Sequence, residues 1–506
     1  MPDPKKELID RLGAILHLSP MAWAIDFEGR LLTWGELGSS ARAVCDALHA
    51  LGVKGGLPVA WLAHNQPEAI AGALGIILSG NSCFVVNPHR PKEAITNELG
   101  SGGFACVVGS NKAALELSRQ FNGPMVLVEE DLSVILKPPE EAGYAQFEPA
   151  GDVAAVLLSS GTTGEPKRVP SSWSEFQRML TVAARTKDGG VTTPSEPQRS
   201  PSLLVNPVSH TSGTFAMFLA LYHARPIVLF RKFDLHAWLD AVGRHRPRLV
   251  SLVPTLVGTL LDADIDPSRL AGLAAIRVGT APLDPEVQAR FEDKFGVPIL
   301  IDYGATEFKG SVTSWTLEDH RRYPTEKRGT VGRAAPGMEV RIVDPSDGRV
   351  LPTGEIGLVD VKRQGNGEVW VRTTDLGHLD GDGFLFLHGR NDDAIIRGGF
   401  KILPEAVEKI LRKHPSVSDV AVVAVPDDRL GQVPVAVVEL VSGASIEVSE
   451  LDELARQSLA AYQTPVGYIT VAELPRTASL KIKRAQVREW AASDMTRLRP
   501  ARAETF

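Results

Sequence analysis

The chain has 506 residues, with 54 Lys plus Arg against 61 Asp plus Glu, so its net charge is −7 with His neutral. Because a single hydrophobic core stops growing at about 250–300 residues, this length predicts at least two domains. A hydrophobic fraction of 43% and a charged fraction of 23% are typical of globular proteins and exclude disordered, collagen-like and coiled-coil chains. The mildly acidic balance gives no electrostatic reason to expect a nucleic acid partner, so small-molecule chemistry is the first hypothesis.

The cysteines and the apolar segments bear on the cellular compartment. Cys45, Cys83 and Cys106 are odd in number and widely spaced, which fits neither a disulfide framework nor a CxxC metal site. This pattern predicts a reducing compartment, most simply the cytoplasm. The charged N-terminal segment lacks the apolar core and cleavage site of a signal peptide. The longest apolar stretch, 69–86, is interrupted by glycines and falls short of the about 20 apolar residues of a membrane span, so we expect no stable membrane insertion.

Apolar runs of strand length alternate with helical patterns along the first three quarters of the chain, which predicts an α/β fold. In chain order, the clearest strands are expected over 154–158, 275–278 and 298–301, and Gly-containing segments follow each of them. Ligand sites in α/β sheets gather at such strand ends. We therefore expect the functional residues in the segments that follow these strands.

The composition changes in the last quarter of the chain. A Gly- and Asp-rich segment at 380–393 precedes a predicted helix that begins at Pro404, in keeping with the preference for proline in the first turn. Two strands are predicted to follow, over 420–425 and 435–440. We therefore place a domain boundary near Arg390.

A cluster of hydroxyl and glycine residues follows the first of these strands directly. It contains Ser159, Ser160, Gly161, Thr162, Thr163, Gly164 and Lys167. Glycines let the backbone approach a ligand, hydroxyls donate to anionic oxygens and a lysine supplies positive charge, which together suit a polyphosphate. No Gly-Lys-Ser/Thr ends the segment, so it is not a Walker A loop. On local evidence alone, a plain turn is an equally good interpretation.

This cluster resembles the phosphate-binding signature of the AMP-forming adenylate synthetases, the superfamily of acyl-CoA synthetases, nonribosomal adenylation domains and luciferases. The resemblance extends in the expected order over most of the chain and is closest to the acyl-CoA synthetases. Its other segments lie at 65–68, 86–88, 207–213, 279–283, 302–307, 374–377, 389–392, 397–401 and 475–481. Because so many motifs occur in the right order, the chain is identified as a member of this superfamily.

The resemblance implies a magnesium and phosphate site at the end of the strand over 298–301. Glu307 would hold Mg²⁺, which is commonly bound by one or two carboxylates plus substrate phosphates. Thr306 would donate a hydrogen bond to the α-phosphate. Taken alone, Glu307 is a solvated surface carboxylate and Thr306 a turn residue.

The resemblance also implies where ATP binds. Asp375 would accept hydrogen bonds from the ribose hydroxyls, as acidic residues do in dinucleotide sites, and Arg390 would lie near the ribose and the phosphates. Taken alone, Asp375 is typical of a helix N-cap or a turn, and Arg390 of a surface cation at a domain edge. The remaining residues implied in ATP binding are Gly279, Thr280, Ala281, Asp302, Tyr303 and Gly304.

Lys481 is the implied catalytic residue of the C-terminal part. Its own context is a basic strand edge, which is common in any protein. The resemblance implies that Lys481 bridges the acyl carboxylate and the α-phosphate, where negative charge must be neutralised as one anion attacks another. Leu480 stands where the superfamily usually has Gly, which predicts a stiffer loop or one shaped for an unusual substrate. Lys483 is the alternative if the loop is shifted.

His210 lies in the segment 207–213, which resembles the acyl-pocket segment of the superfamily. The resemblance also implies that Gly304 lines this acyl pocket. Most lone histidines are structural, but the resemblance implies that His210 lines the pocket beside the acceptor tunnel. We do not expect it to act as a general base. We find no HExxH motif and no Cys/His cluster in the sequence, so we expect no zinc site.

The implied architecture is a large multi-layer α/β domain over 1–389 and a small, mobile α+β domain over 390–506. In the first half-reaction, a small-molecule carboxylic acid would attack the α-phosphorus of Mg-ATP and give acyl-AMP and pyrophosphate. The small domain would then rotate about Asp392 and bring Gly398 and Gly399 to the site, where they would line the acceptor tunnel.

The acceptor is less well defined by the sequence. Two adjacent glycines suit a narrow channel for a phosphopantetheine arm, so coenzyme A is the first choice. An amine, which would make the protein an amide synthetase, is the second choice, and a carrier protein is the third. A catalytically inactive nucleotide-binding relative is a further alternative, but the joint presence of Lys167, Glu307, Asp375 and Lys481 argues against it.

Overall fold

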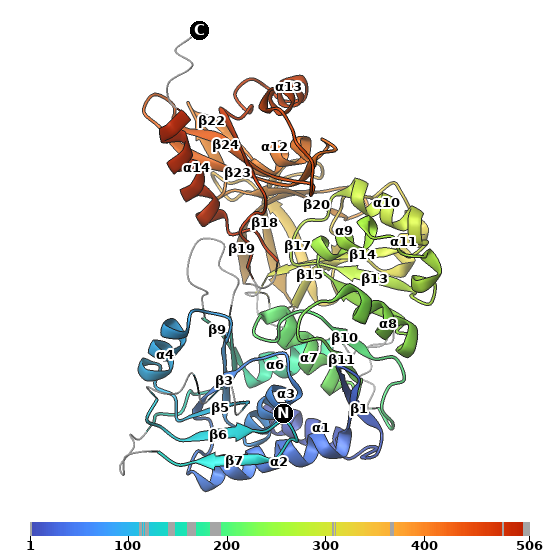
Figure 1. Cartoon of the computed structure of the whole chain (residues 1–506), viewed down its shortest axis with the longest axis vertical. Coiled ribbons are helices and arrows are strands. Elements are labelled where there is room, and N and C mark those ends of the chain that lie inside the picture. Colours follow the sequence, from blue (N-terminus) through green and yellow to red (C-terminus); the bar gives the residue numbers. More distant parts are fainter. Residues whose placement is uncertain are drawn as a thin grey trace.

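The computed structural model describes residues 3–110, 114, 116, 121–139, 147–158, 168–182, 194–305, 308, 310–364, 369–477 and 480–498. Helices and strands are mixed along the chain, and a smaller C-terminal body lies at one end of the molecule, as Figure 1 shows. The predicted fold class is therefore confirmed. Among the residues described here, no helix combines the length and the apolar character that a membrane crossing requires.

A seven-stranded sheet, in the order β7-β6-β5-β3-β4-β8-β9, forms the end of the molecule opposite the C-terminal body (Figure 1). Its strands are β3 (Pro58–Leu62), β4 (Ser82–Val86), β5 (Cys106–Ser110), β6 (Met125–Val128), β7 (Val134–Lys137), β8 (Val153–Leu158) and β9 (Arg168–Ser172). The helices beside it are α2 (Trp34–Ala50), α3 (Pro67–Leu78), α4 (Lys92–Ser101) and α6 (Trp173–Val182). α3 is buried from Pro67 to Ile77 because it packs between α2 and the sheet. A helix that is apolar on all sides is stable only in such a position.

A second sheet, in the order β10-β11-β1-β2, adjoins the first. Its elements are β1 (Trp23–Phe27), β2 (Arg30–Thr33), β10 (Ser202–Leu204) and β11 (Ile227–Leu229), with helices α1 (Pro4–Ile15), α7 (Thr211–Tyr222) and α8 (Leu235–His245). α7 contacts α1, α6 and β8, so it links the two sheets. Asn65 adds a polar link, because its amide donates to the carbonyl of Phe230 (3.0 Å) and its side-chain oxygen accepts from the Val208 amide (2.8 Å).

Two further sheets form the middle of the molecule (Figure 1). The five-stranded one contains β12 (Leu249–Leu252), β13 (Ala275–Val278), β14 (Ile299–Ala305), β15 (Gly310–Ser314) and β16 (Arg333–Ala334), with α9 (Pro254–Asp262), η1 (Pro267–Leu270), α10 (Pro285–Phe295) and α11 (Leu317–Arg322). The antiparallel one contains β17 (Met338–Val343), β18 (Gly357–Arg363), β19 (Trp370–Leu379) and β20 (Leu385–Arg390). The strands predicted over 154–158, 275–278 and 298–301 correspond to β8, β13 and β14.

The C-terminal body is built on β21 (Ile395–Arg397), β22 (Phe400–Ile402), β23 (Val417–Asp427), β24 (Gly431–Leu440) and β25 (Gly467–Val471), with α12 (Pro404–Leu411), α13 (Val448–Ser458) and α14 (Arg484–Leu498). Alternate residues of β23 enter two different hydrophobic clusters, with Val420 and Val422 in one and Ala421 and Val423 in the other. The sheet is therefore buried on both faces and has its own core. Both predicted strands are longer than expected, because β23 and β24 pair over almost their whole length.

A buried carboxylate ties the helices of this body to its sheet. Glu408, on α12, is 1% exposed, and its Oε1 accepts from the Val422 amide (2.8 Å) and from Nη2 of Arg484 (2.7 Å). Its Oε2 accepts from Nη2 of Arg412 at 3.3 Å. One side chain therefore joins α12, β23 and the start of α14.

We predict that Glu408→Gln destabilises the C-terminal body by about 3 kcal/mol, because it removes the buried charge that Arg484 pairs with and leaves Arg412 with Asp419 alone. Hydrogen exchange at the amides of α12 and β23 measures the free energy of opening of this body. Glu453→Gln, on the exposed surface of α13, is the control and should change little. Equal protection in both variants would show that Glu408 is not the tie that its contacts suggest.

Candidate functional site

One cavity of about 2530 Å³ brings most of the predicted site residues together. It lies where the five-stranded sheet, the antiparallel sheet, α7 and the segment 480–484 of the C-terminal body meet. The predicted residues that line it are His210, Gly279, Thr280, Ala281, Asp302, Tyr303, Gly304, Asp375, Arg390 and Lys481. Residues from six separate sequence motifs therefore face one space.

Other predicted residues lie outside the described part of the chain. They are Ser159, Ser160, Gly161, Thr162, Thr163, Gly164, Lys167, Thr306 and Glu307. The described residues next to them do line the cavity, since Leu158 at the end of β8 and Gly304 near the end of β14 are both in its wall. Thr211 on α7 also donates a hydrogen bond to the Leu158 carbonyl (2.9 Å). The phosphate and magnesium roles of these residues stay predictions.

The carboxylate of Asp375 is held at the wall by a side chain from another sheet. The hydroxyl of Tyr303, on β14, donates to Oδ2 of Asp375, on β19. The alternative interpretation of Asp375 as a helix N-cap is wrong, because this residue lies within a strand and pairs with Arg390 of β20. Arg390 donates in turn to Oγ1 of Thr374 (2.7 Å) and to Oδ2 of Asp392 (2.7 Å). Asp375 and Arg390 are therefore neighbours across the strands that lead to the predicted hinge.

Close backbone approaches shape the wall around β14. A Cβ atom on Gly304 would lie 2.4 Å from the carbonyl oxygen of Gly310, so the pairing of β14 with β15 requires glycine there. Thr280 has φ +75°, a left-handed conformation that side chains rarely adopt and that is frequent at functional sites. Beside it, Arg277 forms an ion pair with Asp302 (3.0 Å). Burial raises the pKa of Asp302 although Arg277 opposes the shift.

Lys481 reaches the cavity from the C-terminal body. Burial, and then the positive charge of Arg390, lower the pKa of Lys481 below its usual value. Burial, and then the charge of Lys481, lower the pKa of His210 to about 4, so its imidazole is neutral near pH 7. Lys483 is exposed and does not line the cavity. The geometry therefore favours Lys481 over Lys483 as the charge at the site.

His210 precedes α7 as its N-cap residue. Its Nε2 atom is buried and has no hydrogen-bond partner within the described residues. A neutral, unpartnered imidazole in a cavity wall agrees with the predicted pocket-lining role. The sequence did not single out the next turns of α7, whose Phe215, Ala216 and Leu219 continue the wall. The spacing of three and four residues that Leu219 has from Ala216 and Phe215 could have revealed this helix face.

The loop before Lys481 explains why glycine is usual at position 480. The Leu480 amide donates to the Thr477 carbonyl (2.9 Å), and the Thr477 amide donates to the Lys481 carbonyl (2.8 Å), which closes a turn. Leu480 has φ +62°, in the left-handed region that favours glycine. Its side chain packs against the hydrophobic cluster of the five-stranded sheet. Leu480 is therefore strained in its backbone and anchored by its side chain.

The predicted acceptor residues lie elsewhere. Gly398 and Gly399 form the turn between β21 and β22, with φ +56° and +88°, and neither lines the cavity. Asp392 is exposed and accepts from Arg390. The structure thus has the Lys481 loop at the cavity and the glycine pair away from it. The hinge and tunnel roles stay predictions.

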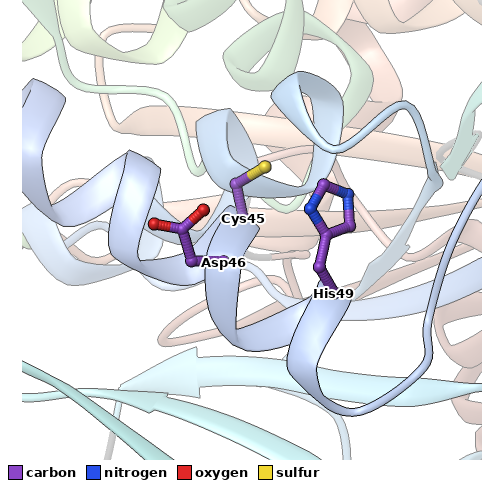
Figure 2. A group of neighbouring side chains, drawn as sticks. All are labelled: Cys45, Asp46 and His49. Atoms are coloured by element: carbon purple, nitrogen blue, oxygen red, sulfur yellow. The ribbon is translucent and has the colours of Figure 1, made fainter.

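The expectation of no Cys/His cluster was wrong. Cys45, Asp46 and His49 on α2 have ligand atoms that all lie within 4.8 Å of one another, and Figure 2 shows them on one side of the helix. Residues four apart on a helix are neighbours, so the Cys45 to His49 spacing could have revealed the group. It includes a thiol, whereas Mg²⁺ prefers oxygen ligands, and it does not line the cavity. It therefore adds nothing to the site described above.

Two family models match the chain. The model of the AMP-binding enzyme family matches residues 16–376, and that of the AMP-binding enzyme C-terminal domain matches residues 406–481. The chain belongs to the AMP-binding enzyme family, and the superfamily predicted from the motifs is confirmed. The C-terminal match ends at Lys481.

Two CoA ligases are similar to the chain over nearly its whole length. Peroxisomal OPC-8:0-CoA ligase 1 of Arabidopsis thaliana is 28% identical over 529 residues, with 97% of this chain and 94% of that protein covered. The 2-succinylbenzoate–CoA ligase of Bacillus subtilis is 26% identical over 488 residues, with 94% and 96% covered. The chain is an AMP-forming enzyme of acyl-CoA ligase type.

Solved structures agree with this assignment. ATP-bound MatB from Rhodopseudomonas palustris has a TM-score of 0.79 at 25% identity, covering 95% of this chain and 98% of that one. The o-succinylbenzoate CoA synthetase of Bacillus subtilis, in complex with ATP and magnesium, has 0.76 at 25%, covering 94% and 98%. The amide bond synthetase McbA from Marinactinospora thermotolerans has 0.78 at 25%, covering 96% and 99%. The fold is shared by enzymes with different acceptors.

We predict that Leu480→Ala is less stable than Leu480→Gly by about 1 kcal/mol, since both lose the packing of the side chain but only glycine relieves the left-handed backbone. Urea titration measures the two free energies of unfolding. Both variants should slow pyrophosphate–ATP exchange because the Lys481 loop loses its anchor. Equal stability of the two variants would show that the turn relaxes once the side chain is removed.

Proposed function

We propose that the enzyme joins a carboxylic acid to coenzyme A through an acyl-AMP intermediate, with ATP and Mg²⁺ as co-substrate and cofactor. The observation that carries this proposal is the meeting of Lys481, from the C-terminal body, with Asp375, Tyr303 and His210 in one cavity. The ATP and magnesium bound in the similar structures, and the CoA ligase relatives, support it.

Charge neutralisation is the main contribution of these residues in the first half-reaction. The attacking carboxylate and the α-phosphate are both anions, and Lys481 would lie between them. Asp375, oriented by Tyr303, would accept hydrogen bonds from the ribose hydroxyls. Holding both reactants in line replaces a bimolecular encounter by a positioned one.

Magnesium would be held by Glu307, next to the end of β14. A carboxylate that follows a sheet strand in the sequence is a suitable oxygen ligand. The ion supplies neutralisation of phosphate charge when bound. Thr306 beside it would donate to the α-phosphate.

For the second half-reaction, we propose that the small domain, residues 390–506, rotates relative to residues 1–389 about Asp392. Rotation would withdraw Lys481 and bring Gly398 and Gly399 to the cavity. A Cβ atom on Gly399 meets nothing within 4 Å in the present pose, although its φ of +88° favours glycine in this turn. We also propose a cytoplasmic location and no nucleic acid partner, because the chain is mildly acidic and its three cysteines are widely spaced.

The nature of the acceptor has a second candidate. Coenzyme A is favoured because the two relatives named above are CoA ligases. An amine is the alternative because an amide bond synthetase shares the fold at the same level of identity. A carrier protein is a third possibility that no structural neighbour given above favours.

We predict that Lys481→Ala lowers the rate of acyl-AMP formation by about 10²–10³-fold, as loss of a preorganised charge contact does. Transfer from supplied acyl-AMP should stay close to the wild-type rate, because Lys481 serves only the first pose. Lys483→Ala is the matched control and should be mild. A damaging Lys483→Ala with a mild Lys481→Ala would mean that the loop is shifted by two residues.

We predict that coenzyme A accelerates AMP release by the wild type and that free thiol disappears in step with it. Gly399→Trp should keep first-turnover pyrophosphate release and lose thioester formation, since a bulky side chain obstructs a close-packed channel. Parallel assays with coenzyme A and with a panel of amines decide the acceptor. Acceleration by amines alone would replace coenzyme A as the acceptor and leave adenylation standing.

A further inference from the structure

Most partly buried arginines in the cavity wall have a carboxylate partner. These pairs are Arg277 with Asp302, Arg328 with Glu292, Arg390 with Asp392, Arg412 with Glu408, Arg476 with Glu439 and Arg484 with Glu408. Such pairing is expected, because a guanidinium removed from water needs a compensating charge or hydrogen bonds.

Two arginines in the same wall depart from this pattern. Arg178 lies on α6 and Arg363 at the end of β18, and both are partly buried. Within the part of the chain that the structure describes, neither has an ion pair or a side-chain hydrogen bond, and the Nε atom of Arg178 is buried without a partner. The carboxylate of Glu175, one turn earlier on α6, accepts from the Ser172 amide (2.9 Å).

The two guanidinium groups also lie close enough to affect each other. Burial, and then the positive charge of Arg178, lower the pKa of Arg363, while Glu175 opposes the shift. Two like charges that share a partly buried wall repel each other and lose hydration. A bound oxyanion would reverse both effects, because guanidinium groups donate to carboxylate or phosphate through pairs of parallel hydrogen bonds.

The position of this pair indicates which oxyanion it meets. α6 and α7 lie side by side, since the rings of Phe176 and Phe218 are 5.2 Å apart and the hydroxyls of Thr181 and Tyr222 are 3.1 Å apart. Arg178 lies on α6 between these two contacts and lines the same cavity as the apolar face of α7, which ends at Leu219. Along the axis of α7, Leu219 is about 13 Å from His210, at about 1.5 Å per residue.

We propose that Arg178 and Arg363 form a subsite for a second acidic group at the far end of the acyl substrate, so that the enzyme prefers dicarboxylic acids. This inference rests on the proposed function, because it places the reacting carboxylate near Lys481 and His210. The α7 wall would contact the apolar chain between the two carboxylates. Its length suits acids of medium size.

The test compares matched pairs of acids in pyrophosphate–ATP exchange. The pairs are octanoic with suberic acid, decanoic with sebacic acid, and 3-phenylpropionic with 3-(4-carboxyphenyl)propionic acid. We expect kcat/KM for the best diacid to exceed that of its monoacid partner by about 10–100-fold, the usual effect of a charge-assisted hydrogen-bonded pair. Comparable kcat/KM values in every pair would overturn the subsite and leave adenylation standing.

Variants show whether the arginines carry the preference. Arg178→Gln and Arg363→Gln should each lower kcat/KM for the diacid about 10-fold or more, through KM, and leave the monoacid unchanged. Arg178→Lys should restore part of the loss. Arg248→Gln is the matched control, because Arg248 is exposed in the same cavity wall, and it should not alter the ratio. An unaltered ratio in the Arg178 and Arg363 variants would overturn the assignment.

Two other outcomes are informative. A raised KM for ATP in the Arg178 and Arg363 variants, equal for both acids of a pair, would mean that the arginines hold the polyphosphate of ATP and would overturn the proposal. Absence of exchange with every acid in the panel would contradict the proposed function. It would also overturn the proposed subsite, which rests on that function.

Discussion

The proposed chemistry depends on one lysine whose positive charge lies in a cavity formed mostly by other parts of the chain. Lys481 belongs to the C-terminal body, yet it lies among residues of β14, β19 and α7 and lowers the pKa of His210. An ammonium group in a cavity wall attracts negatively charged ligands. The site is therefore arranged for negatively charged ligands, and the packing of Leu480 holds the charge in place before they bind.

The sequence predicted the fold class and the site residues best where function is encoded in short motifs. The strands predicted over 154–158, 275–278 and 298–301 are apolar runs that lead into Gly-containing segments, and Leu158, Gly279 and Gly304 among the described residues line the cavity. Asp375 was harder, because a carboxylate beside threonine and glycine fits a turn as well as a strand. Only its pairing with Arg390 across two strands decides between them.

Other features depend on contacts that no local pattern contains. Arg178 and Arg363 come from a helix and a strand far apart in the chain, so their shared place in the cavity wall follows only from the tertiary fold. The left-handed backbone of Leu480 could not be predicted from the sequence either, since leucine does not indicate a positive φ. The Cys45 and His49 pair differs from these, because its spacing on a helix was visible and was overlooked.

The two-faced core of the C-terminal body has a mechanical consequence. Glu408 joins α12, β23 and α14, and the sheet is packed on both sides. In the proposed rotation, this body would therefore move as one rigid unit. Leu480 and the Gly398–Gly399 turn both belong to this rigid body. Since one rigid body cannot present both loops to one cavity together, the two chemical steps would be separated in time by geometry alone, without any additional signal.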